Sequence, residues 1–120
     1  MAYIDGFVIP VPMDKEDDYR ALAAKAATIF IEYGAKRIVE CWGDDVPDGQ
    51  VTDFKRAVKA EADENVVFSW IVWPSKEVRD AAMSKIMSDP RTKPEGEMPF
   101  DGKRLIFGGF AILLDTAAEV

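Results

Sequence analysis

The sequence contains no histidine and a single cysteine, Cys41. Without an imidazole there is no Ser-His-Asp triad, no histidine ligand for zinc or haem, and no general base that titrates near neutrality unaided. One thiol can form neither an internal disulfide nor a thiolate-rich metal site. We therefore expect no bound metal and no cofactor, and we expect Cys41 to be a buried structural residue.

Long apolar runs are also absent. Runs such as Val66-Val67-Phe68 and Leu105-Ile106-Phe107 are far too short to cross a bilayer. The chain does not begin with a basic region followed by an apolar stretch, as a secretory signal would. A single cysteine also fits a reducing compartment. We expect a cytoplasmic protein that has no membrane partner.

Positive charge is scarce, since 15 lysines and arginines face 22 aspartates and glutamates, for a net charge of −7. Such a field repels a phosphate backbone unless basic residues form a local stripe. The candidate segments for such a stripe are Lys55, Arg56 and Lys59 and the pair Lys103-Arg104, and neither has the interleaved aromatic residues of a stacking surface. We expect no nucleic-acid partner.

The hydrophobic pattern predicts one α+β domain over residues 1–120. Alternating or uninterrupted apolar residues predict strands at 2–11, 36–44, 65–73 and 105–115, and spacings of three and four predict helices at 14–33 and 75–87. Residues 51–64 fit either a short helix or an extended arm that turns back into the next strand, and we favour the arm. This order is the ferredoxin-like split βαβ arrangement, a four-stranded antiparallel sheet with both helices on one face.

Both faces of the predicted sheet are apolar. An antiparallel sheet that exposes one face to water alternates apolar and polar residues, whereas here Tyr3 stands beside Ile4 and Trp70 beside Ile71. A second layer must cover the face without helices. The economical cover is another copy of the same sheet, so we predict a homodimer with a barrel-like interior, a dimeric α+β barrel.

Five segments together resemble the YbaA-like bacterial family, a domain of unknown function numbered 1428. They are YIDGFVIPVP at 3–12, ECWGDDVP at 40–47, VVFSWI at 66–71, PSK at 74–76 and MPFDGKR at 98–104. The resemblance covers nearly the whole chain. It implies a dimeric α+β barrel and a homodimer, and it implies no catalytic residue, because no activity is established for that family.

The predicted strand at 36–44 carries the most informative side chains. Period-two alternation places Glu40 and Trp42 on one face and Val39 and Cys41 on the other. We expect Val39 and Cys41 to pack beneath the helices, which directs Glu40 and Trp42 into the barrel.

A carboxylate in a barrel is costly to bury without a partner. We expect Asp5 in surroundings similar to those of Glu40, with Arg104 as the counter-ion. Two interpretations remain open. In the first, which we favour, these residues make ion-pair contacts at the barrel mouth and carry out no chemistry. In the second, a carboxylate of raised pKa acts there as acid or base.

Two functions are consistent with this pattern. The favoured one is a non-catalytic dimer that binds a small metabolite in the barrel cavity. The alternative, implied by analogy with dimeric α+β barrels, is a cofactor-independent enzyme of the monooxygenase or isomerase kind, with Glu40 or Asp5 as base and Arg104 or Lys103 stabilising an anion. The expected ligand-binding residues are Trp42, Trp70, Tyr3, Phe7 and Arg104.

Overall fold

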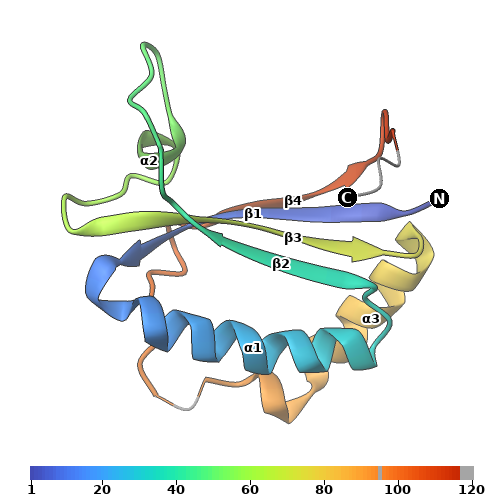
Figure 1. Cartoon of the computed structure of the whole chain (residues 1–120). Coiled ribbons are helices and arrows are strands. Elements are labelled where there is room, and N and C mark those ends of the chain that lie inside the picture. Colours follow the sequence, from blue (N-terminus) through green and yellow to red (C-terminus); the bar gives the residue numbers. More distant parts are fainter. Residues whose placement is uncertain (95, 117–120) are drawn as a thin grey trace.

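The computed structural model describes residues 1–94 and 96–116. Four strands form one antiparallel sheet in the order β2-β3-β1-β4, and helices α1 and α3 lie against one of its faces (Figure 1). The strands are β1 (Tyr3–Pro12), β2 (Arg37–Trp42), β3 (Glu64–Trp73) and β4 (Ile106–Ala111); the helices are α1 (Glu16–Glu32), α2 (Phe54–Ala57) and α3 (Lys76–Ser88), with short 3-10 turns η1 (Met13–Lys15) and η2 (Pro90–Thr92). The predicted ferredoxin-like arrangement is confirmed.

The core lies between the sheet and the two long helices. One cluster is centred on Trp73, which is fully buried, and on Ile29 of α1 and Ile86 of α3. A second cluster joins Val11 and Val67 to the start of α1. The predicted stripe of α1 therefore points at the sheet, and complete burial of each such side chain stabilises the fold by about 1.5–3 kcal/mol.

Local signals set the end of α1 and the start of α3 close to where the sequence predicted them. Gly34 follows α1 with a φ of 116°, a left-handed conformation that favours glycine. The Ser75 hydroxyl caps α3 by accepting a hydrogen bond from the Val78 amide at 3.1 Å. The start of α1 differs from the prediction, since η1 comes first and α1 begins at Glu16 without a side-chain cap.

The segment between β2 and β3 is not the extended arm that we favoured. It contains α2, whose N-cap Asp53 accepts a hydrogen bond from the Arg56 amide at 2.7 Å. The Arg56 side chain also bonds Asp53 and carbonyl groups of the preceding loop. Phe54 then packs edge-on against Phe68 of β3, with ring centroids 5.8 Å apart. The N-cap at Asp53 and the contact between Phe54 and Phe68 therefore stabilise a short helix in this segment.

The strands β2 and β4 are shorter than predicted. β2 ends at Trp42, and β4 ends at Ala111 although apolar residues continue to Leu114. β4 pairs with β1 along Ile106–Ala111. Beyond that pairing Leu113 and Leu114 are 100% and 82% exposed, so hydropathy alone overestimated the length of the strand.

Candidate functional site

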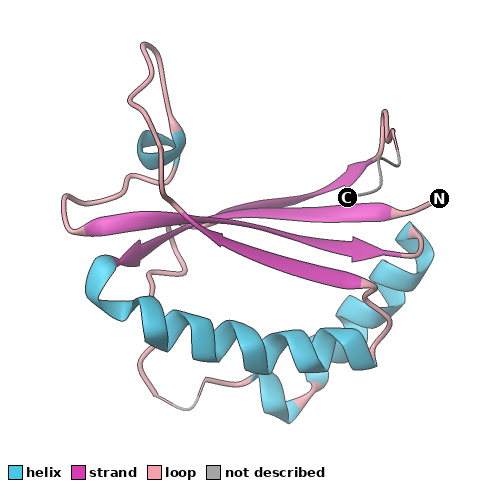
Figure 2. Cartoon of the chain, viewed as in Figure 1, coloured by secondary structure: helices cyan, strands magenta, loops and turns pink. Residues whose placement is uncertain are grey.

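Strand pairing assigns every strand residue to one of two faces. Asp5 lies opposite Ile71, and Ile71 lies opposite Ile38, so these residues share the face that is covered by α1 and α3, here called the helix face. The other face, here called the open face, has the short helix α2 near one end and neither of the long helices, as Figure 2 shows. Its central positions are Ile4, Gly6 and Val8 of β1, Val39 and Cys41 of β2, Phe68, Trp70 and Val72 of β3, and Ile106, Gly108 and Phe110 of β4.

The predicted site residues do not meet in one cavity. Tyr3, Asp5, Phe7, Glu40 and Trp42 lie on the helix face, whereas Trp70 lies on the open face. The expected orientation of β2 is therefore wrong. The reason is that alternation defines two faces without saying which one the helices cover, and here both faces are apolar.

Cys41 also departs from the prediction. It lies on the open face opposite Phe68 and is exposed in the single chain rather than buried beneath the helices.

The groove between α1 and β2, here called the α1–β2 groove, has a volume of about 310 Å³. Its walls are Glu16, Tyr19, Arg20, Ala23, Ala24 and Ala27 of α1, Ile38, Glu40, Cys41 and Trp42 of β2, and Val67 of β3. The alanines of α1 leave this space, because a helix with larger side chains at those positions would fill it. Two of the predicted residues, Glu40 and Trp42, thus line a groove, though on the opposite side of the sheet from the predicted barrel.

Glu40 and Tyr19 form the polar part of the groove. The buried Tyr19 hydroxyl donates a hydrogen bond to Glu40 Oε1 at 2.7 Å. Desolvation raises the pKa of Glu40, and the hydroxyl groups of Tyr19 and Ser69 partly oppose that rise. Burial and the adjacent carboxylate raise the pKa of Tyr19 well above its ordinary value, so it stays a hydrogen-bond donor at all physiological pH values.

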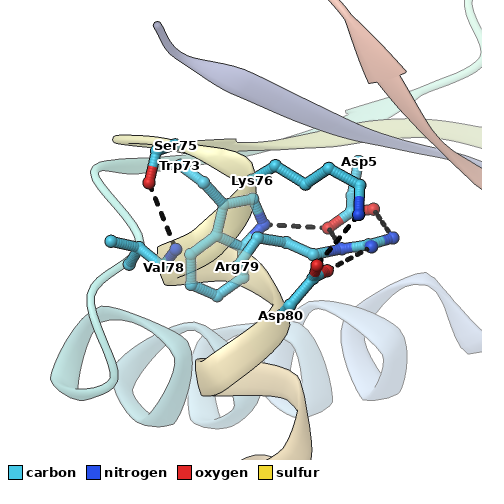
Figure 3. Close-up of polar contacts among 7 residues, drawn as sticks. All are labelled: Asp5, Trp73, Ser75, Lys76, Val78, Arg79 and Asp80. Carbon is cyan, nitrogen blue, oxygen red and sulfur yellow. Dashed lines mark hydrogen bonds and ion pairs between the residues drawn. The ribbon is translucent and has the colours of Figure 1, made fainter.

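Asp5 belongs to a separate and fully partnered cluster, drawn in Figure 3. Its side chain is 2% exposed and accepts hydrogen bonds from Trp73 Nε1 at 2.8 Å and from Arg79 at 2.8 and 3.1 Å. Arg79 also pairs with Asp80 and stands over the Tyr3 ring, 5.3 Å from its centroid. This arrangement satisfies the buried carboxylate and ties α3 to the sheet.

Arg104 is not the counter-ion of Asp5 or Glu40, so that prediction is wrong. It precedes β4, and its guanidinium binds Glu64 at 2.6 and 2.7 Å and Asp101 at 3.0 Å. Arg104 thereby lowers the pKa of Glu64 and fastens the loop before β4 to the start of β3.

Sequence reasoning missed Tyr19 and Arg79. Tyr19 belongs to the predicted apolar stripe of its helix, and its phenol could have been matched to a carboxylate on the neighbouring strand. No local signal identifies Arg79, because its partner Asp5 is 74 residues away.

A cluster of metal ligands and a membrane-spanning helix are both absent from the described residues. In residues 1–94 and 96–116, no three or more cysteine, aspartate and glutamate side chains gather in a way that would hold a metal ion. Within the same ranges, no helix has the length and hydropathy needed to span a membrane.

Comparison with known proteins places the chain in a family. Over 116 residues it is 68% identical to the uncharacterized protein YbaA of Escherichia coli strain K12 and to that of Shigella flexneri, covering 96% of this chain and 99% of each relative. Among solved structures, the de novo designed protein Foldit4 aligns with a TM-score of 0.47 at 11% identity over 93% of this chain and 99% of its own. Rv0793 from Mycobacterium tuberculosis aligns with a TM-score of 0.45 at 14% identity over 98% of this chain and 100% of its own. The family described as protein of unknown function (DUF1428) matches residues 2–102, and the chain belongs to this family.

Proposed function

We propose that the protein is a non-catalytic homodimer that binds one small molecule in the α1–β2 groove of each protomer. The observation that carries the binding function is the groove itself, an apolar space of about 310 Å³ with one convergent polar pair, Tyr19 and Glu40. Small-molecule sites are concave, mostly apolar and supplied with a few placed polar groups, and they start at about 300 Å³. The groove meets each of these criteria.

The open face supports the assembly with a second copy. Large apolar side chains remain exposed on it, with Phe68 and Ile106 each 46% and Phe110 60% accessible. Phe54, Phe68 and Trp70 form a chain of aromatic contacts there, at centroid distances of 5.8 and 5.7 Å. A surface of this kind on a folded domain marks an interaction site.

The distribution of charge supports a second copy as the occupant. The chain has a net charge of −7, so two copies repel one another unless they meet through a neutral surface. On the open face the charged strand positions of the described residues are Arg37 and Glu64, both at strand ends, and Glu64 is neutralised by Arg104. A face with this composition can lie against its own copy without like-charge contact.

The strands of the open face supply about half of the area that a standard interface needs, and neighbouring segments add to it. Four strands of about six residues span a plane on the order of 400 Å², and a standard interface buries about 800 Å² per partner. Figure 1 shows two projections on the same side as the open face, the segment with α2 and residues 112–116. Val51, 92% exposed, and Leu113, 100% exposed, add apolar surface on them for contact with a partner.

A cofactor-independent enzyme is the alternative, and the raised pKa of Glu40 is the observation that favours it. Such an enzyme also needs a group that stabilises the anion formed when a proton is removed. Neither predicted group, Arg104 or Lys103, lines the groove, and Arg104 is bound to Glu64 and Asp101. We therefore propose binding without catalysis.

Native mass spectrometry of untagged protein, released gently from its host cells, tests both parts of the proposal. We expect a dimer that carries a reproducible additional mass. A dimer without additional mass would contradict ligand binding, and a monomer would contradict the assembly. Conversion of the bound molecule during incubation would support the enzyme alternative instead.

A further inference from the structure

Glu40 is an exposed residue of β2 that lines the α1–β2 groove, and it differs from the carboxylates that are buried in the fold. Four carboxylates with a side chain at most 7% exposed each contact an arginine: Asp5 with Arg79 at 2.8 Å, Asp53 with Arg56 at 2.9 Å, Glu64 with Arg104 at 2.6 Å, and Asp89 with Arg91 at 2.8 Å. In the part of the chain that the structure describes, Glu40 forms no ion pair, and its recorded partners are the hydroxyl groups of Tyr19 and Ser69. It is an oriented carboxylate without a cation.

The other charges of the α1–β2 groove do not supply that cation. Among the described residues, Arg20 is the one basic residue in its wall, and its guanidinium binds Glu16 at 3.0 Å and Asp17 at 2.8 Å. The groove therefore carries an unbalanced negative charge at Glu40. An anionic ligand would be repelled there, and a ligand cation would be attracted.

The remaining walls define the rest of the ligand. Ala24 and Ala27 offer a smooth apolar surface on α1, and Val67 forms part of the floor. Trp42 lies on the same face of β2 as Glu40, two residues along the strand. An indole face attracts both apolar groups and organic cations.

We propose that the α1–β2 groove selects small molecules that carry a primary ammonium group on a compact apolar body. The ammonium group binds the Glu40 carboxylate, and the body lies between the alanines of α1 and Trp42. This inference rests on the proposed ligand-binding function and specifies the chemistry of its ligand. Charge-assisted hydrogen bonds of this kind are stronger than neutral ones by about tenfold or more in affinity.

Three probes with the same phenyl body test the selection in the wild-type protein: phenethylamine, 2-phenylethanol and 3-phenylpropionate. Each is titrated at pH 7 while the amide and indole signals of the 15N-labelled protein are followed by NMR. We expect phenethylamine to shift the signals of Ala24, Ala27 and Trp42 with a Kd at least about tenfold lower than that of the alcohol. The carboxylate probe is expected to leave these signals unchanged.

Two matched variants locate the charge that is responsible. Glu40→Gln keeps an acceptor for Tyr19 and removes the charge, so phenethylamine should bind it only as weakly as the alcohol does. Glu61→Gln changes an exposed residue in the turn before β3 and should leave both affinities unchanged.

The outcomes separate this inference from the proposed function. Equal binding of amine and alcohol in the groove would overturn the ammonium selection and leave the groove as a ligand site. Amine binding that Glu40→Gln does not weaken, or no amine binding at all, would also overturn the selection. The comparison of probes uses the wild-type protein, so it holds even if Glu40→Gln proves unstable.

Discussion

Replacing Phe110 with aspartate is expected to separate the proposed dimer, whereas the same change at Phe107 is expected to leave it intact. Both residues lie on β4 and both are more than half exposed in the single chain, at 60% and 72%. They point to opposite faces, since Phe110 lies opposite Ile4 on the open face and Phe107 lies opposite Phe7 on the helix face. The two variants therefore differ in the face that they alter and in little else.

The expected magnitude follows from the exposed area of Phe110. A phenylalanine side chain of about 200 Å² that is 60% exposed presents about 120 Å² to a partner. At about 25 cal/mol per Å², burial of this area is worth about 3 kcal/mol, and the twofold axis doubles it to about 6 kcal/mol. Since each 1.4 kcal/mol is tenfold, the Kd of the dimer should rise by about ten-thousandfold.

Light scattering coupled to size-exclusion chromatography, run over a concentration series, measures this change. The wild-type protein and Phe107→Asp should elute with the mass of two chains, and Phe110→Asp with the mass of one. Circular dichroism of each variant serves as the control for folding. A Phe110→Asp protein that stays dimeric, or a Phe107→Asp protein that dissociates equally, would refute the assignment of the interface to the open face.

Three further predictions concern stability. Arg79→Met should lower the free energy of unfolding by about 2–4 kcal/mol, because it leaves the buried Asp5 without its counter-ion. Urea titration measures this change, and an unchanged unfolding midpoint would contradict a structural ion pair. Gly34→Ala should cost about 1–3 kcal/mol in the same titration, because alanine is strained at a φ of 116°. Acid should loosen α2: hydrogen bonds from Arg56 hold the pKa of Asp53 at about 2, below its ordinary 3.8. The stabilisation of α2 is thus complete above pH 3.8 and lost as the pH falls through 2. The Arg56 amide signal should therefore weaken over that range in NMR spectra. A signal that stays unchanged below pH 2 would contradict a role of the Asp53 carboxylate in holding α2.

The sequence alone predicted the number, type and order of the main elements. Spacings of three and four in α1 and the apolar strands β1 and β3 are local patterns, and so are Gly34 after α1 and Ser75 before α3. Each of these signals acts within a few residues, which is why it can be recognised without tertiary contacts. α2 was missed because its apolar residues fit a strand and a helix equally well.

Only the tertiary structure decided which face each strand turns toward the helices and which charges meet. Alternation at period two is the same for both faces, so Glu40 and Trp42 were assigned to the wrong side while the strand itself was correct. The pairing of Asp5 with Arg79 rather than Arg104 depends on where α3 crosses the sheet, and no rule of spacing reaches over 74 residues. The candidate site arises in the same way, because a groove exists only after a helix with small side chains has packed beside the edge strand of a sheet.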